Sequence, residues 1–205
     1  MTGIYIATED ELSEVMAYRL IEEAAHDLSV SVPMRAGGFG YLKNKAPDLL
    51  KLAHNVPVFL LADLDTSVCP SALRENWLGT GINLPDDLLF RIAVREVEAW
   101  LLADREGFAA FTGAPITQIP ATPETLVDPK ATLLHLVNRY GKREQKVGIV
   151  RRDGTNLKQG LEYNLQLGLF VKDKKQWSLE RALVNANSLS RAYHRLRELD
   201  ARHSS

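Results

Sequence analysis

Two carboxylates stand at the end of an apolar run in the first third of the chain. Residues 56–62 are apolar, Asp63 follows directly, and Asp65 follows after one intervening residue. An apolar run of this length is typical of a strand buried on both faces of a parallel sheet. Because ligands of open α/β sheets bind beyond the carboxyl ends of the strands, we expect these aspartates at a site of chemistry. Their charges repel, and a divalent cation is the simplest ligand that would make the pair favourable.

Acidic residues also follow two other expected strands. Glu9 comes after a strand expected at 4–6, and Glu96 and Glu98 come after a strand expected at 88–94. Since the ends of parallel strands lie on one side of a sheet, these groups could converge with the aspartate pair. Two Mg²⁺ ions bound by such oxygens can hold the attacking and leaving oxygens of a phosphodiester. The pattern therefore predicts Mg²⁺- or Mn²⁺-dependent phosphoryl transfer.

A structural interpretation of the same acids stays open. An aspartate at a strand end often caps the following helix, so Asp65 could simply begin the turn toward Pro70. Glu9 and Asp10 could likewise interact with the N-terminal dipole of the next helix. Each acid taken alone is more often structural than catalytic.

The elements that would position these acids alternate between strands and helices. We expect strands at 4–6, 29–32, up to 63 and at 88–94, and helices at 10–27, 46–54, 70–78 and 95–104. This alternation predicts an α/β fold of Rossmann-like type, with a parallel sheet of about four strands flanked by helices. We expect this core at 1–112, a proline-rich linker at 113–129, and a mostly helical extension at 130–205 packed on the core. A helix at about 130–140 and a terminal helix at 178–199 would form much of that extension.

Composition narrows the class of protein. The chain has 205 residues, of which 45% are hydrophobic and 25% charged, as in a soluble globular protein. We expect no membrane span and no signal peptide, because no apolar run is long enough and the first residues lack a basic and a long apolar region. The single cysteine, Cys69, cannot form an internal disulfide, so we expect a cytoplasmic protein. The glycine loop at 35–40 lacks the spacing of a P-loop or a dinucleotide site, and no His-Glu-x-x-His zinc motif is present.

Basic residues gather in one later segment. The net charge of −1 means that a nucleic-acid partner needs a local basic patch. Such a patch is predicted from Lys142, Arg143, Lys146, Arg151 and Arg152, with Lys158 beyond them. It would contact a phosphate backbone, although a solvated strand edge is an equal alternative. The arginines of the terminal helix could face solvent, a second copy of the chain in a homodimer, or another partner.

Three stretches resemble an uncharacterised bacterial family with a Toprim-like domain, a domain also found in topoisomerases, primases and OLD (overcoming lysogenization defect) nucleases. They are residues 9–14, the Asp63-Leu64-Asp65 motif, and residues 95–104, which read Arg-Glu-Val-Glu-Ala-Trp-Leu-Leu-Ala-Asp. The resemblance implies a nuclease that acts on DNA or RNA, with a separate ATPase partner and a role in phage defence.

The resemblance also implies roles for single residues. Glu9, Asp63 and Asp65 would bind Mg²⁺, with Glu9 also the general base, while Glu96 and Glu98 would form the further acidic motif of OLD-type nucleases. A lysine near the scissile phosphate in those enzymes has a candidate counterpart in Lys130. Toprim domains have Glu-Gly where this chain has Glu9-Asp10. Another alignment puts Ala7 at the glutamate position, which would remove the base.

Two other functions remain open. The run Asp63-Leu64-Asp65-Thr66 matches the Asp-x-Asp-x-Thr motif of haloacid dehalogenase-type phosphatases, but two expected strands precede it, whereas that family carries the motif on its first strand. Alternatively, a Toprim-like fold without its base would act as a sensor or a non-catalytic regulatory subunit of an ATPase.

Overall fold

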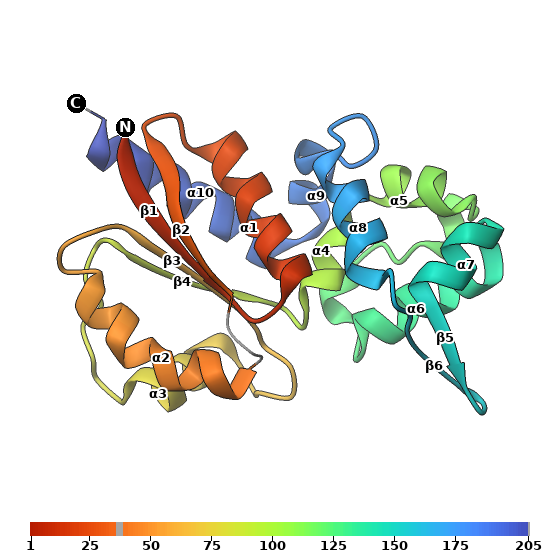
Figure 1. The fold of residues 1–205 in the computed structure, drawn as a ribbon, viewed down its shortest axis with the longest axis horizontal. Helices are drawn as coiled ribbons and strands as arrows, with labels where there is room; N and C mark the ends of the chain where they lie inside the picture. Colours follow the sequence, from red (N-terminus) through yellow and green to blue (C-terminus); the bar gives the residue numbers. More distant parts are fainter. Residues whose placement is uncertain (36–38, 205) are drawn as a thin grey trace. The chain divides into compact units, whose positions relative to one another are not determined.

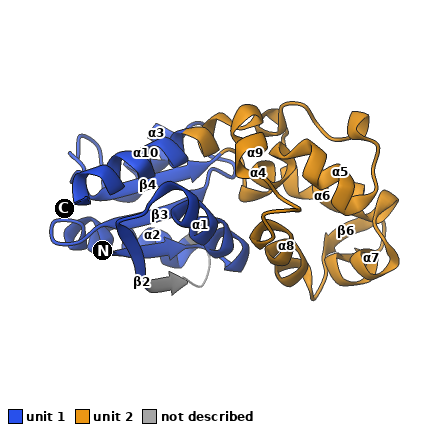
Figure 2. Cartoon of the chain, turned by 90° about the horizontal axis from the view of Figure 1, so that it is seen from above, with its two compact units in different colours: residues 1–93, 191–205 blue, residues 94–190 orange. Residues whose placement is uncertain are grey.

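The computed structural model describes residues 1–35 and 39–204, so part of the expected glycine loop at 35–40 lies outside the described residues. The chain forms two compact units, shown in Figure 2. Unit 1 contains residues 1–93 and 191–205, and unit 2 contains residues 94–190.

Unit 1 is an α/β layer structure built on a parallel sheet (Figure 1). Its strands are β1 (Thr2–Thr8), β2 (Leu28–Arg35), β3 (Val58–Asp63) and β4 (Leu88–Ala93), in the order β2-β1-β3-β4. The connecting helices are α1 (Glu11–Ala24), α2 (Phe39–Leu52) and α3 (Pro70–Leu78). This confirms the predicted α/β fold with a four-stranded parallel sheet.

The central strand β3 explains why the apolar run is so long. Each residue from 58 to 62 is at most 1% exposed. The strand pairs in parallel with β1 on one side and β4 on the other, with Thr8 opposite Leu61 and Asp63 opposite Ala93. A strand covered on both faces needs apolar residues throughout, and the run ends where the chain leaves the sheet at Asp63.

The end of α10 (Asn187–His203) belongs to unit 1 and returns the chain to the sheet. The buried carboxylate of Asp200 accepts hydrogen bonds from the backbone N–H groups of His26 at 2.9 Å, Asp27 at 2.8 Å and Leu28 at 3.0 Å. These three bonds fix α10 to the segment that joins α1 to β2.

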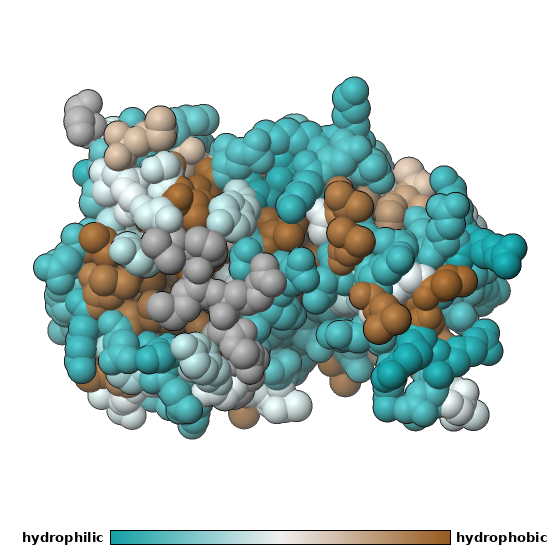
Figure 3. All heavy atoms as spheres, in the orientation of Figure 1, coloured by the Kyte–Doolittle hydropathy of each residue, from teal (hydrophilic) through white to brown (hydrophobic). Residues whose placement is uncertain are grey.

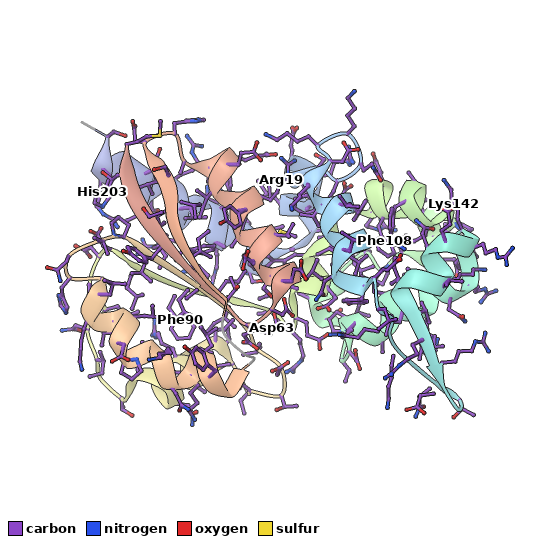
Figure 4. All side chains as sticks on the ribbon, in the orientation of Figure 1. Arg19, Asp63, Phe90, Phe108, Lys142 and His203 are labelled. Atoms are coloured by element: carbon purple, nitrogen blue, oxygen red, sulfur yellow. The ribbon has the colours of Figure 1, made fainter. Side chains whose placement is uncertain are left out.

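Unit 2 is mostly helical and confirms the expected helical character of the C-terminal region. It contains α4 (Val97–Ala103), α5 (Arg105–Thr112), α6 (Pro129–Tyr140), α7 (Arg143–Ile149), α8 (Tyr163–Lys172) and α9 (Leu179–Asn185). Strands β5 (Val150–Asp153) and β6 (Asn156–Gln159) form an antiparallel ribbon. The core of unit 2 includes Phe108, labelled in Figure 4, whose ring lies 6.0 Å from that of Phe170.

The division into units differs from the expected one. The boundary falls after residue 93 rather than after 112, and residues 113–129 belong to unit 2 instead of joining two parts. Ile119 is 1% exposed, so this proline-rich segment contributes to the core. The expected terminal helix is two helices, because Ala186 has extended backbone angles and ends α9. The carboxylate of Glu124 then accepts the N–H groups of Asn187 and Ser188 at the start of α10.

The outer surface is largely hydrophilic on the face shown in Figure 3, with separate apolar patches. Exposed apolar residues include Leu161, Leu165 and Leu169, four positions apart in and just before α8. No helix in the described ranges is long and apolar enough to cross a membrane.

Candidate acidic site

The central contact of the candidate site joins the ends of β1 and β3. Glu9 follows β1 directly, and its Oε1 accepts the backbone N–H of Asp63 at 3.1 Å. Asp63 lies at the carboxyl edge of the sheet (Figure 4). From this point β1 connects to β2 on one side, whereas β3 connects to β4 on the other. Such a reversal of strand order is where open α/β sheets bind their ligands.

The electrostatic environment of Glu9 is unusual for an acid near the surface. Its pKa is raised from the usual 4.5 to about 7, mainly by burial; the negative charges of Asp65 and Asp10 contribute to the rise, and the hydrogen bond from the Asp63 N–H opposes it. A carboxyl group that titrates near neutral pH can accept or release a proton under physiological conditions. Perturbed groups of this kind concentrate at functional sites.

The neighbouring acids separate the structural interpretation from the functional one. Asp10 is the N-cap of α1, and its Oδ1 accepts the N–H of Ser13 at 2.8 Å. Glu9 lies outside the helix and bonds to β3 instead. Capping therefore accounts for Asp10 and leaves Glu9 without a role in helix formation.

Asp65 lies in a tight turn after β3. Its φ of 47° is in the left-handed region, which costs free energy for a residue with a side chain but is tolerated by aspartate. The N–H of Ser67 donates to the carbonyl of Leu64 at 2.9 Å, so the turn is hydrogen-bonded. The carboxylate of Asp65 is exposed, yet close enough to Glu9 to raise its pKa. Asp65 thus begins the turn, as the structural interpretation expects, while still contributing charge to the site.

A second acidic group lies wholly inside unit 2. Glu98 is 2% exposed, and its Oε1 accepts the phenolic O–H of Tyr163 at 2.6 Å and lies 3.5 Å from Nζ of Lys130. The backbone N–H of Lys130 donates to Oε2 of Glu96 at 3.0 Å, and its ammonium group lies 5.1 Å from the centre of the Tyr163 ring. The contacts join α4, α6 and α8.

The pKa of Glu96 is raised to about 7. Burial is the main cause, and the charges of Glu98 and Asp128 add to it, while the Lys130 N–H and ammonium oppose it. Three predicted site residues, Glu96, Glu98 and Lys130, thus meet in one network. The sequence did not predict the pairing of Tyr163 with Glu98, because the two residues are 65 positions apart and share no motif.

The predicted basic patch lies on α7, its N-cap Lys142 and the β5–β6 ribbon, and its residues are exposed except Lys146, which is half-buried. Residues 139–158 contain seven basic and two acidic side chains. Arg151 lies directly opposite Lys158 in the ribbon, and like charges in that position destabilise it. Lys158 forms an ion pair with Asp153, and Arg152 donates to Asn138 at 3.3 Å. These contacts offset part of the charge.

Glu9, Asp63 and Asp65 of unit 1 offer only carboxylate oxygens as metal ligands, and hard cations such as Mg²⁺ prefer oxygen ligands. Among the residues that the structure describes, no three histidine, cysteine or acidic side chains are arranged to hold one ion. A cation would therefore require these carboxylates to move closer together.

Comparison of the chain with protein-family models, curated proteins and solved structures finds no match. The Toprim-like resemblance therefore stays a hypothesis based on the three sequence stretches.

Proposed function

We propose that this protein is a Mg²⁺-dependent nuclease, or a related phosphoryl-transfer protein, that acts on nucleic acid. The observation that carries the proposal is the contact between Glu9 and Asp63 at the reversal point of the sheet. A buried glutamate with a pKa of about 7 beside a further aspartate is favourable for binding a cation. The Toprim-like pattern has a glutamate after the first strand and Asp-x-Asp after the third, and the positions of Glu9, Asp63 and Asp65 agree with it.

In this proposal Asp63 and Asp65 bind Mg²⁺ or Mn²⁺, and Glu9 serves as a ligand or general base. A bound ion would polarise the phosphate and lower the pKa of the attacking water. The positive charge would also favour ionised Glu9, which burial otherwise opposes. Within unit 2, Glu96 and Glu98 are proposed as ligands of a second ion, for which Oε1 of Glu98 would have to exchange its contacts with Tyr163 and Lys130 for the metal. Lys130 is proposed as a group that stabilises phosphate charge.

The nucleic acid would bind through the basic side chains of α7 and the ribbon, which are Lys142, Arg143, Lys146, Arg151 and Arg152. The opposed charges of Arg151 and Lys158 support this assignment, because a phosphate backbone would relieve their repulsion. A separate ATPase subunit and a homodimer are proposed from the sequence resemblance and from the arginine-bearing terminal helix.

The test is cleavage of end-labelled single- and double-stranded DNA and RNA in the presence of Mg²⁺ or Mn²⁺. We expect Asp63→Asn and Glu9→Gln to lower the cleavage rate by about 100-fold or more, because each removes a group that the metal chemistry needs. Glu11→Gln is the matched control, since Glu11 is exposed in the first turn of α1. Equal cleavage by wild type and Asp63→Asn would contradict the proposal.

One outcome would favour the regulatory alternative. If the wild-type protein cleaves none of these substrates, is not stabilised by millimolar Mg²⁺ or Mn²⁺, and co-purifies with a separate ATPase, a non-catalytic subunit is the better assignment. Rapid hydrolysis of a small phosphomonoester, lost in Asp63→Asn, would instead support the haloacid dehalogenase-type mechanism.

A further inference from the structure

An arginine stands in the middle of an otherwise apolar strand of unit 1. Strand β4 reads Leu-Leu-Phe-Arg-Ile-Ala, and Arg91 is its charged residue. Side chains alternate between the two faces of a strand. Phe90, labelled in Figure 4, packs toward α3, with its ring 5.3 Å from that of Trp77. The alternation therefore places Arg91 on the opposite side of the sheet.

Helix α10 lies on that opposite side and runs antiparallel to β4. At one end, Nε2 of His203 lies 3.0 Å from Oδ1 of Asp87, just before the strand. At the other end, the hydroxyl of Ser188 accepts the N–H of Val94, just after it, at 3.3 Å.

The spacing of residues then matches helix to strand. Arg195 lies eight residues before His203, a distance of ~12 Å along a helix. Arg91 lies four residues after Asp87, a distance of ~13 Å along a strand. Arg195 is therefore level with Arg91, and Arg191 lies one helical turn further on.

These arginines lack sufficient negative charge around them. Glu198 is paired with Arg195 at 2.6 Å. Within the described ranges, no carboxylate forms an ion pair with Arg91 or Arg191, and Nε of Arg91 is buried without a hydrogen-bond partner. A buried polar atom without a partner is destabilising, and so is the approach of three like charges.

The electrostatics agree with this geometry. Burial lowers the pKa of Arg91, and the charges of Arg195, Arg191 and Arg74 lower it further, with Glu198 acting against them. Arg74 adds a fourth positive charge from α3.

We propose that Arg91, Arg191 and Arg195 form a binding site for a phosphate group. A guanidinium group offers paired N–H donors that match two oxygens of a phosphate, and several arginines around one anion would remove their mutual repulsion. The phosphate could belong to free phosphate-bearing small molecules or to a nucleic-acid backbone. The site shares no residue with the acidic group at Glu9 or with the basic patch of unit 2, and it needs no metal.

The test is binding to the full-length protein in EDTA at constant ionic strength, so that metal chemistry does not contribute. The two probes are inorganic phosphate and a short single-stranded DNA without terminal phosphates, measured by calorimetry and by the shift in thermal unfolding. We expect at least one probe to bind, and Arg91→Met to weaken that binding by about tenfold or more, as for the loss of charged hydrogen bonds. Arg197→Met is the control, because Arg197 is an exposed arginine of the same helix.

The two probes separate the sources of the phosphate. Binding of inorganic phosphate alone indicates a small phosphorylated ligand, and binding of the oligonucleotide alone indicates a nucleic-acid backbone. Arg195→Met gives an independent measurement if Arg91→Met fails to fold. The inference is overturned if neither probe binds the wild-type protein more tightly than chloride does, or if the variants at 91 and 195 bind as well as Arg197→Met.

Discussion

Tyr163 donates its phenolic O–H to Oε1 of Glu98 across 2.6 Å, and both residues are 2% exposed. Lys130 approaches the same oxygen, with its Nζ at 3.5 Å. The buried carboxylate is thus satisfied by a neutral donor and a cation from two other helices. This arrangement fixes the position of the Lys130 ammonium group, which is the group proposed to stabilise phosphate charge.

Removing the phenolic hydroxyl should destabilise the fold. We expect Tyr163→Phe to lower the free energy of unfolding by about 1.5 to 3 kcal/mol, because it deletes a hydrogen bond to a buried charged group. Urea denaturation gives the value. Tyr140→Phe serves as the control in the same unit and should change stability by less than about 0.5 kcal/mol. Equal effects at both positions would mean that the Tyr163 hydroxyl contributes no stabilising contact.

The last residue of the motif at 95–104 has a structural role. Asp104 is fully buried and accepts Nε and an Nη of Arg181 at 2.6 and 2.7 Å, together with the N–H groups of Gly107 and Ser178. It therefore caps α5 and holds the start of α9. Asp104 therefore has a structural role, although it belongs to a motif that was identified through the sequence resemblance.

Asp104→Ala should accordingly cost more than a surface substitution. We expect a loss of about 2 to 4 kcal/mol in the free energy of unfolding, since Arg181 and two backbone N–H groups lose their partner. Glu106→Gln is the matched control, because Glu106 lies 3.8 Å from the same guanidinium but is exposed. Chemical denaturation compares the two variants. A cost at Asp104 no larger than that at Glu106 would contradict this account.

The sequence predicted the elements whose signals are local. Strand β3 ends at Asp63 because the apolar run ends there, and the helix expected at 70–78 matches α3, which begins at Pro70. The placement of acids after strand ends follows from the same patterns. Residue types alone left open whether Glu9 and Asp10 interact with the helix N-terminus or belong to a site, and the hydrogen bonds place Asp10 at the N-cap and join Glu9 to β3.

The features that the sequence did not predict depend on distant partners. The carboxylate of Glu124 accepts the N–H of Asn187 at the start of α10, although the two residues are more than sixty positions apart. The carboxylate of Asp200 joins the same helix to the backbone at His26. Neither contact has a periodic pattern in the chain, so the terminal helix was predicted as one continuous element and assigned to a different domain. The pairing of Glu98 with Tyr163 was missed for the same reason.

The raised pKa of Glu9 should appear in the dependence of stability on pH. An unfolded glutamate titrates near 4.5, and Glu9 in the folded protein titrates at about 7. Between these values the folded state binds more protons, so its stability falls as pH rises. We expect Glu9→Gln to match wild type near pH 4.5 and to be more stable at pH 8. The difference in the free energy of unfolding between the two proteins is at most about 3 kcal/mol, and partial solvent access makes it smaller.

Urea denaturation across this pH range measures the effect. Glu11→Gln, an exposed change in the next helix, should run parallel to wild type at every pH. A Glu9→Gln curve that also stays parallel to wild type would show that Glu9 titrates as an ordinary surface acid. Under the proposed function, Mg²⁺ should stabilise wild type at pH 8 more than it stabilises Glu9→Gln, because the ion offsets the buried charge.

Asp10, unlike its neighbour Glu9, should matter for stability and not for cleavage. Asp10→Ala removes the side-chain oxygen that accepts the N–H of Ser13 at the start of α1. The expected loss is about 1 kcal/mol in the free energy of unfolding, and Asp10→Ser should restore most of it because serine is also a good N-cap. Nucleic-acid cleavage should persist in both variants if Glu9, Asp63 and Asp65 hold the metal. Loss of cleavage in Asp10→Ser, with stability preserved, would instead place Asp10 among the residues that the chemistry needs.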